Sequence, residues 1–210
     1  MADPFATVAA ERRALADLLE SLSEEQWATR SLCGAWTVKD VAAHVMIGPT
    51  VSTREFLVAM VRAGGRFGVA NRRMVEARAR LSTAELVAIM REHADSRFRP
   101  PTMDWHAPWT EILVHREDIA VPLGGFPRPV EPWGPALDFL VSDAAVRGFR
   151  AKGLPALHYA ATDLDWSYGD GPEVRGPAAA LALGMAGRPV ALERLTGDGL
   201  DRFAVWVRRE

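Results

Sequence analysis

The sequence has little cysteine and no long apolar run. Cys33 is the single cysteine among 210 residues, which excludes an intramolecular disulfide framework and any cysteine-rich zinc module. No stretch approaches the roughly 20 uncharged apolar residues that a membrane-spanning helix needs. Charges begin at Asp3 and leave no apolar segment of signal-peptide length at the N-terminus. We therefore expect a cytoplasmic protein without a membrane partner.

An excess of charge of either sign is also missing. Lys and Arg total 25 against 27 Asp and Glu, which gives a formal net charge of -2. This balance provides no general field for attracting phosphate backbones, so we expect no nucleic-acid partner. The composition leaves a monomer and a homodimer open. If the protein holds a metal, the ligands come mainly from its five histidines and its carboxylates.

Residues 1–127 carry helical patterns and are assigned to one helical domain. Apolar residues recur at helical spacing, Ser23 and Ser82 open capping-box patterns, and Asp40 favours a helix start at Thr37. The predicted helices cover residues 4–22, 37–48, 50–65, 67–80, 82–96 and 109–123. The segment 98–108, with three prolines, is predicted as an irregular loop.

Residues 128–210 differ in pattern and are assigned to a small α+β portion. Partial alternation followed by a Gly-Asp-Gly-Pro turn is typical of a strand that ends in a tight turn. The expected elements are a helix over 132–150, a strand within 154–169, a second strand at Val174, an Ala-rich helix over 176–188 and a strand or helix over 201–209. The predicted fold class is therefore mainly α with a small C-terminal α+β portion.

The segment around His115 carries the strongest sign of a site. At about 100° per residue, Glu111, His115 and Asp118 fall within one narrow sector of a helix. Apolar residues flank this sector on both sides: Val114 and Val121 on one, Ile112 and Ile119 on the other. Charged groups on the apolar face of a helix cost several kcal/mol unless they are paired or bound to a metal. The pattern therefore indicates a site.

A second histidine completes a possible ligand set. His44 lies at the edge of the apolar stripe of the helix that starts at Thr37. Together with Glu111 and His115 it makes a set of two nitrogens and one oxygen, which suits Zn²⁺ or a similar divalent ion and leaves one coordination position open. Asp118 could orient a ligand or cap a backbone group. The alternative is that these side chains are solvated pairs or hydrogen-bonded core histidines.

Two motifs resemble those of a known family. The first is GAWTVKDVAAH, residues 34–44, and the second is EILVHREDIAVPLG, residues 111–124. Weaker similarity follows in the tail at residues 162–167, 176–181 and 187–189. Together these segments resemble the mycothiol-dependent maleylpyruvate isomerase family within the DinB-like superfamily of metal-binding four-helix bundles. The tail is similar to the C-terminal portion that is common in actinobacterial members of the family. The first motif departs from the family pattern in one respect, since one residue is inserted between Gly34 and Trp36.

The resemblance implies a fold and a chemistry. It implies a DinB-like four-helix bundle with a C-terminal domain similar to sterol-carrier proteins, and a divalent metal, usually zinc, held by His44, Glu111 and His115. It also implies mycothiol as a thiol cosubstrate, bound to the metal as a thiolate that attacks a small electrophile. In the isomerase reaction the thiolate adds to a conjugated double bond, rotation follows, and elimination releases the trans isomer.

The substrate and the reaction stay open at this stage. Arg175 and Arg188 are candidates for binding a substrate carboxylate, with a surface or helix-end role as the alternative. The resemblance implies an isomerase or a thiol transferase. A metal-dependent hydrolase of the same fold is a second interpretation. A bundle that binds a small ligand or a partner without catalysis is a third.

Overall fold

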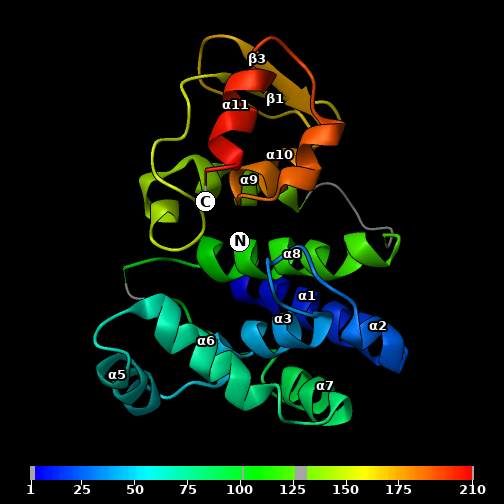
Figure 1. Ribbon diagram of the computed structural model, residues 1–210, viewed down its shortest axis with the longest axis vertical. Coiled ribbons are helices and arrows are strands. Elements are labelled where there is room, and N and C mark those ends of the chain that lie inside the picture. The colour runs from blue at the N-terminus through cyan, green and yellow to red at the C-terminus, as the bar shows by residue number, and fades with distance from the viewer. Residues whose placement is uncertain (1–2, 101, 126–131, 210) are drawn as a thin grey trace. The chain divides into compact units, whose positions relative to one another are not determined.

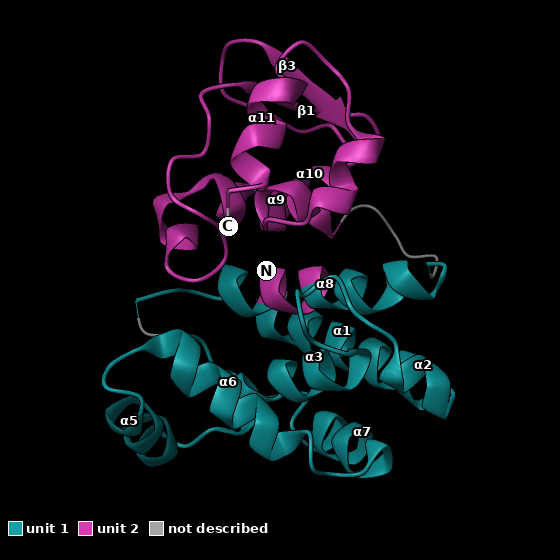
Figure 2. Cartoon of the chain, viewed as in Figure 1, with its two compact units in different colours: residues 1–108, 115–126 teal, residues 109–114, 127–210 magenta. Residues whose placement is uncertain are grey.

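The computed structural model describes residues 3–100, 102–125 and 132–209 (Figure 1). The chain divides into two compact units (Figure 2): residues 1–108 with 115–126, and residues 109–114 with 127–210. The predicted domain boundary between residues 127 and 128 lies outside the described residues. Among the described residues, no helix is long and apolar enough to cross a membrane.

The first unit is built from helices joined by loops of different lengths. They are α1 Pro4–Glu20, α2 Glu24–Ala28, α3 Val38–Val45, α4 Ile47–Thr50, α5 Thr53–Arg62, α6 Phe67–Arg78, α7 Thr83–Glu92 and most of α8 His106–Ala120. Helix α1 packs on α7, and α3 packs on both α6 and α7. Their apolar faces form the core of the unit, which includes fully buried Leu15, Leu19, Val41 and Leu86.

Local side-chain signals set several helix starts, of which those at Thr37 and Ser82 were predicted. Ser23, Thr37 and Ser82 each cap a helix, and each forms a capping box with the residue three positions later. In the Thr37 box the Asp40 carboxylate accepts from the Thr37 backbone N–H at 2.9 Å. This box fixes where α3 begins and therefore where its last turn, with His44, lies.

Helix α8 starts earlier than predicted. It begins at His106, inside the predicted loop, because the Asp104 carboxylate accepts a hydrogen bond from the His106 backbone N–H at 3.0 Å and so satisfies a donor at the helix start. A 3₁₀ turn, Val121–Leu123, follows the helix. Gly124, at a φ of 95°, ends it. The helix is continuous although residues 109–114 are grouped with the second unit.

The second unit combines a small sheet with helices. Its elements are α9 Trp133–Val141, β1 His158–Ala161, β2 Ser167–Tyr168, β3 Glu173–Gly176, α10 Ala178–Met185 and α11 Leu200–Val207, with 3₁₀ turns at Asp143–Val146 and Pro189–Arg194. The strand order is β2-β1-β3, with β1 antiparallel to β2 and parallel to β3. The mainly α class with a small α+β C-terminal part is thereby confirmed.

Two segments of this unit differ from, or decide between, the predicted elements. The helix predicted over 132–150 is wrong beyond Val141, because Ser142 turns to an extended conformation with a ψ of 160° and its hydroxyl donates to the Phe139 carbonyl. The segment left open as strand or helix forms α11, whose Phe203 packs edge-on against Tyr159 of β1 with ring centroids 5.4 Å apart.

Candidate metal centre

Helix α3 positions the first candidate ligand. His44 lies in its last turn and is half-buried, while Val41 and Val45 on the same helix are buried in the core. The His44 Nδ1 atom lies 3.1 Å from the Asn71 amide oxygen on α6. The Trp36 ring lies beside the imidazole, with centroids 5.1 Å apart. These contacts hold the ring in one orientation.

Helix α8 contributes the other candidate ligands from the face that the helical spacing predicts. The Asp118 side chain is fully buried and that of His115 is 13% exposed. The His115 Nδ1 atom lies 2.8 Å from Asp118 Oδ2, a contact between residues three apart on one helix. Ile112 and Ile119 beside them are at most 1% exposed. The polar groups therefore interrupt a buried apolar surface.

The structure brings the three predicted ligands together. One ligand atom each from His44, Glu111 and His115 lies within 4.8 Å of the others. The two imidazole rings meet edge-on, with centroids 4.8 Å apart. Ligand atoms around a zinc ion lie about 3 to 4 Å from one another, so side-chain adjustments of roughly 1 to 2 Å complete the geometry. Two imidazoles and one carboxylate are a donor set that fits a divalent ion with an open position.

Oxygen acceptors fix the orientation and the tautomer of both imidazole rings. Asn71 accepts from the Nδ1 atom of His44, and Asp118 accepts from that of His115. A neutral imidazole that donates from Nδ1 carries its lone pair on Nε2. Metal-binding histidines are oriented in this manner by a carboxylate or carbonyl oxygen behind the ring. The arrangement supports the expectation that Asp118 orients a ligand.

The pKa of His115 shows that its surroundings favour positive charge on the ring. Burial alone would lower the pKa, but the hydrogen bonds with Asp118 and Cys33 outweigh burial and raise the pKa of His115 to about 10. The buried Asp118 carboxylate therefore strongly stabilises positive charge on the ring. A cation at the opposite nitrogen would be stabilised by the same carboxylate.

Cys33 is a neighbour that the sequence did not reveal. Its thiol donates to Asp118 Oδ2 at 2.9 Å and lies 3.7 Å from His115 Nδ1. Cys33, His115 and Asp118 form a second group of close ligand atoms. The loop that carries the cysteine is tied to α8, because the Leu32 backbone N–H donates to the Asp118 carbonyl at 3.1 Å. No local sequence pattern predicts the contact between Cys33 and Asp118, because the two residues are 85 positions apart.

Asn71 is the other residue that sequence reasoning missed. It lies in the polar run Asn-Arg-Arg of α6, which reads as an exposed helix face. No local pattern in the sequence distinguishes Asn71 from the arginines that follow it. Its contact with His44 depends on the packing of α3 against α6.

The contacts of the remaining polar candidates are as follows. Arg175 lies exposed on β3, where its backbone pairs with Thr196. Arg188 donates to the carbonyl of Ala186 at the end of α10. A substrate role for either arginine stays a prediction. The histidines outside the candidate set lie at the end of α7 (His93), against Asp104 (His106) and against the Gly169 carbonyl (His158).

Comparisons with known proteins agree with this architecture. No curated protein matches the chain. Two solved structures match over 94% of this chain and 96% of theirs, each with a TM-score of 0.54: the mycothiol-dependent maleylpyruvate isomerase at 17% identity, and its mutant with a histidine changed to alanine at 16%. They share the fold. Residues 8–111 match the family model described as the mycothiol maleylpyruvate isomerase N-terminal domain. Residues 8–111 thus form a domain of the mycothiol maleylpyruvate isomerase N-terminal domain family.

Proposed function

We propose that the chain is a thiol-dependent enzyme with one divalent metal ion, zinc, held by His44, Glu111 and His115. The observation that carries this proposal is the convergence of their ligand atoms to within 4.8 Å. The orientation of both imidazoles by oxygen atoms of Asn71 and Asp118 supports it further. Three protein ligands are the number found at catalytic zinc sites, where a fourth position stays open.

The residues around the proposed ion would have different roles. His115 would give up its proton to bind the ion, after which both imidazoles are neutral and Glu111 supplies the one negative charge. A bound divalent ion would therefore keep a net positive charge that attracts an anionic sulfur. When bound, the ion would supply a Lewis acid that lowers the pKa of a thiol and so makes it a nucleophile at neutral pH. Asp118 would hold His115 in place through the contact of its carboxylate with Nδ1.

The proposed cosubstrate is mycothiol and the proposed substrate a small electrophile. The family name and the names of the similar structures point to mycothiol and to isomerisation. Addition of the thiol to a conjugated double bond, rotation about the resulting single bond and elimination would return the thiol unchanged, so isomerisation balances without a further reactant. Transfer of the thiol onto the substrate would stop after the addition.

Metal analysis of the purified protein tests the ligand set. We expect about one divalent ion per chain, and the variants His44→Ala, Glu111→Ala and His115→Ala should each lose most of it. His106→Ala is the matched control, since His106 also lies on α8 but contacts Asp104. Unchanged metal content in all three ligand variants, or equal loss in the control, contradicts the assignment.

A cobalt-substituted sample tests the thiol. Addition of mycothiol should change the visible spectrum of the wild-type protein, because sulfur binding to cobalt adds charge-transfer bands. Conversion of maleylpyruvate that requires mycothiol would establish the isomerase. A mycothiol adduct that accumulates would establish a transferase. Ester or amide hydrolysis without any thiol, and no spectral change, would favour the hydrolase.

A further inference from the structure

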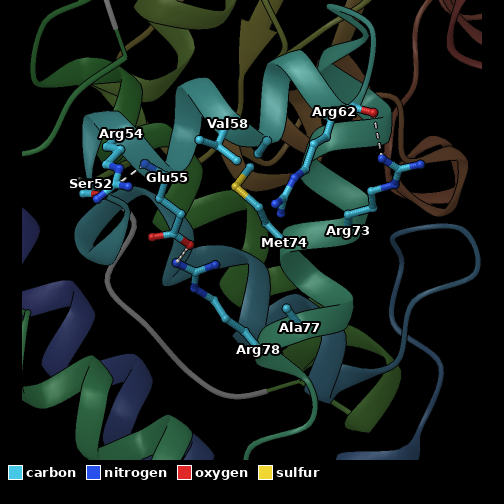
Figure 3. Close-up of a pocket in the computed structure, with 10 residues that line it drawn as sticks. Ser52, Arg54, Glu55, Val58, Arg62, Arg73, Met74, Ala77 and Arg78 are labelled. Carbon is cyan, nitrogen blue, oxygen red and sulfur yellow. Dashed lines mark hydrogen bonds and ion pairs between the residues drawn. The ribbon is translucent and has the colours of Figure 1, made fainter.

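A hollow of about 420 Å³ lies between α5 and α6 in the first unit (Figure 3). Four arginines and one carboxylate line it: Arg54, Arg62, Arg73, Arg78 and Glu55. The volume is in the range of small-molecule sites. None of the lining residues is a candidate metal ligand, so the hollow is a separate feature.

The charges around the hollow are not balanced. Arg78 pairs with Glu55 at 3.1 Å, and its side chain is only 15% exposed. Arg73 donates to the backbone carbonyl of Arg62 at 2.9 Å, which leaves its charge in place. Within the described part of the chain, no carboxylate pairs with Arg54, Arg62 or Arg73. Three positive charges therefore gather around one hollow at a repulsive cost that an anion would remove.

Apolar side chains form part of the same wall. Val58 of α5 and Met74 of α6 line the hollow, and Figure 3 shows the Arg62 side chain extending toward Met74. Helix α5 has no fully buried side chain, while Met74 is 6% exposed. The hollow between the two helices thus combines guanidinium groups with a small apolar surface.

We propose that this hollow binds a small organic anion whose carboxylate or phosphate lies between the guanidinium groups of α5 and α6. Arginine suits both groups, because its planar guanidinium donates two parallel hydrogen bonds to paired oxygens. The apolar part of the ligand packs on Val58 and Met74. The site is additional to the proposed metal centre, and its occupation does not depend on the metal.

Methyl NMR of the full chain labelled at methionine tests the site. Phenyl phosphate, benzoate and the neutral benzyl alcohol are the probes, and Met74→Leu assigns the Met74 signal among seven methionines. We expect the Met74 methyl to shift with one or both anions and not with benzyl alcohol. The anion that shifts it at lower concentration identifies the ligand as a phosphate or a carboxylate. No Met74 shift with either anion up to about 10 mM overturns the proposal.

Two variants separate a site from a general positive field. Arg73→Gln should weaken binding of the preferred anion about tenfold, because it removes a charge-assisted hydrogen bond. Arg72→Gln removes the same charge from the adjacent position of α6, where Arg72 faces Glu76 at 4.0 Å and does not line the hollow. It should change the affinity less than about twofold. Equal weakening by both variants overturns the proposal. Metal content, measured in parallel, should be the same in both variants.

Discussion

Helices α8 and α10 are both buried on most sides, but they use burial differently. In α10, the residues Ala178 and Ala180 to Met185 are buried and none of them carries a polar side chain. In α8, Thr110 and Asp118 are completely buried, and Arg116 is 8% exposed, among apolar neighbours. A helix needs no buried polar groups for packing, as α10 shows. Those of α8 therefore require another explanation, and the candidate metal centre supplies it for Asp118.

Replacing Asp118 with alanine is the strongest way to make α8 resemble α10. The change removes the acceptor for both His115 and Cys33. We expect the free energy of unfolding to fall by about 4 kcal/mol, because the buried His115 ring and the Cys33 thiol both lose their acceptor. Metal affinity should fall by about 10- to 100-fold. Urea denaturation and competition with a chelator measure the two effects.

Asp118→Asn is the control for this prediction. It keeps the volume and one oxygen acceptor but removes the negative charge. We expect a smaller loss of stability than with alanine, of about 2 kcal/mol, and an intermediate metal affinity. If both variants lose stability while metal affinity stays at the wild-type value, Asp118 is a structural residue and does not orient a ligand.

Removing a packing residue from α10 should lower the stability of the protein and leave its metal content unchanged. Leu181 is completely buried. Leu181→Ala leaves a cavity and should lower the free energy of unfolding by about 3 kcal/mol, again measured by urea denaturation. The metal content of the folded protein should equal that of the wild type. A loss of metal from the folded variant would mean that packing around α10 also shapes the ligand set, and the contrast between the helices would fail.

The contrast explains what the sequence could and could not predict. The capping boxes at Thr37 and Ser82 involve residues three apart, so local rules find them. The shared face of Glu111, His115 and Asp118 follows from helical spacing alone. These features depend only on neighbours along the chain.

The missed features depend on tertiary contacts. Asn71 reaches His44 across 27 positions, and Cys33 reaches Asp118 across 85. The parallel pairing of β1 with β3 likewise joins segments that local patterns do not connect. The early start of α8 is different, because Asp104 lies only two residues before His106. There the three prolines of the segment favoured a loop over a weak local cap.

Asn71→Ala tests the contribution of an acceptor that lies outside α8. The variant removes the oxygen that holds His44 Nδ1 at 3.1 Å. We expect metal affinity to fall about tenfold, with a change in the free energy of unfolding below about 1 kcal/mol. Asn71→Asp keeps an acceptor and should retain most of the affinity. Equal losses in the alanine and aspartate variants would indicate that Asn71 supports the packing of α6 and does not act through His44.

Thr110 is a completely buried polar residue of α8 that the candidate centre does not use. Among the described residues, its Oγ1 atom has no hydrogen-bond partner, and the residue is completely buried. An unsatisfied buried hydroxyl costs about 1 kcal/mol or more. Thr110→Val keeps the shape and removes the hydroxyl, so it should raise the free energy of unfolding by about 1 kcal/mol.

Thr110→Ser is the matched control for the direction of the change in the free energy of unfolding. It keeps the hydroxyl and removes one buried methyl group, so it should lower the free energy of unfolding by about 1 kcal/mol. Urea denaturation of the two variants measures both changes. If valine destabilises the protein as much as serine, the hydroxyl of Thr110 makes a favourable contact in solution. In that case Thr110 would be a second buried polar residue of α8, beside Asp118, whose polar group is satisfied, and the contrast with α10 would become sharper.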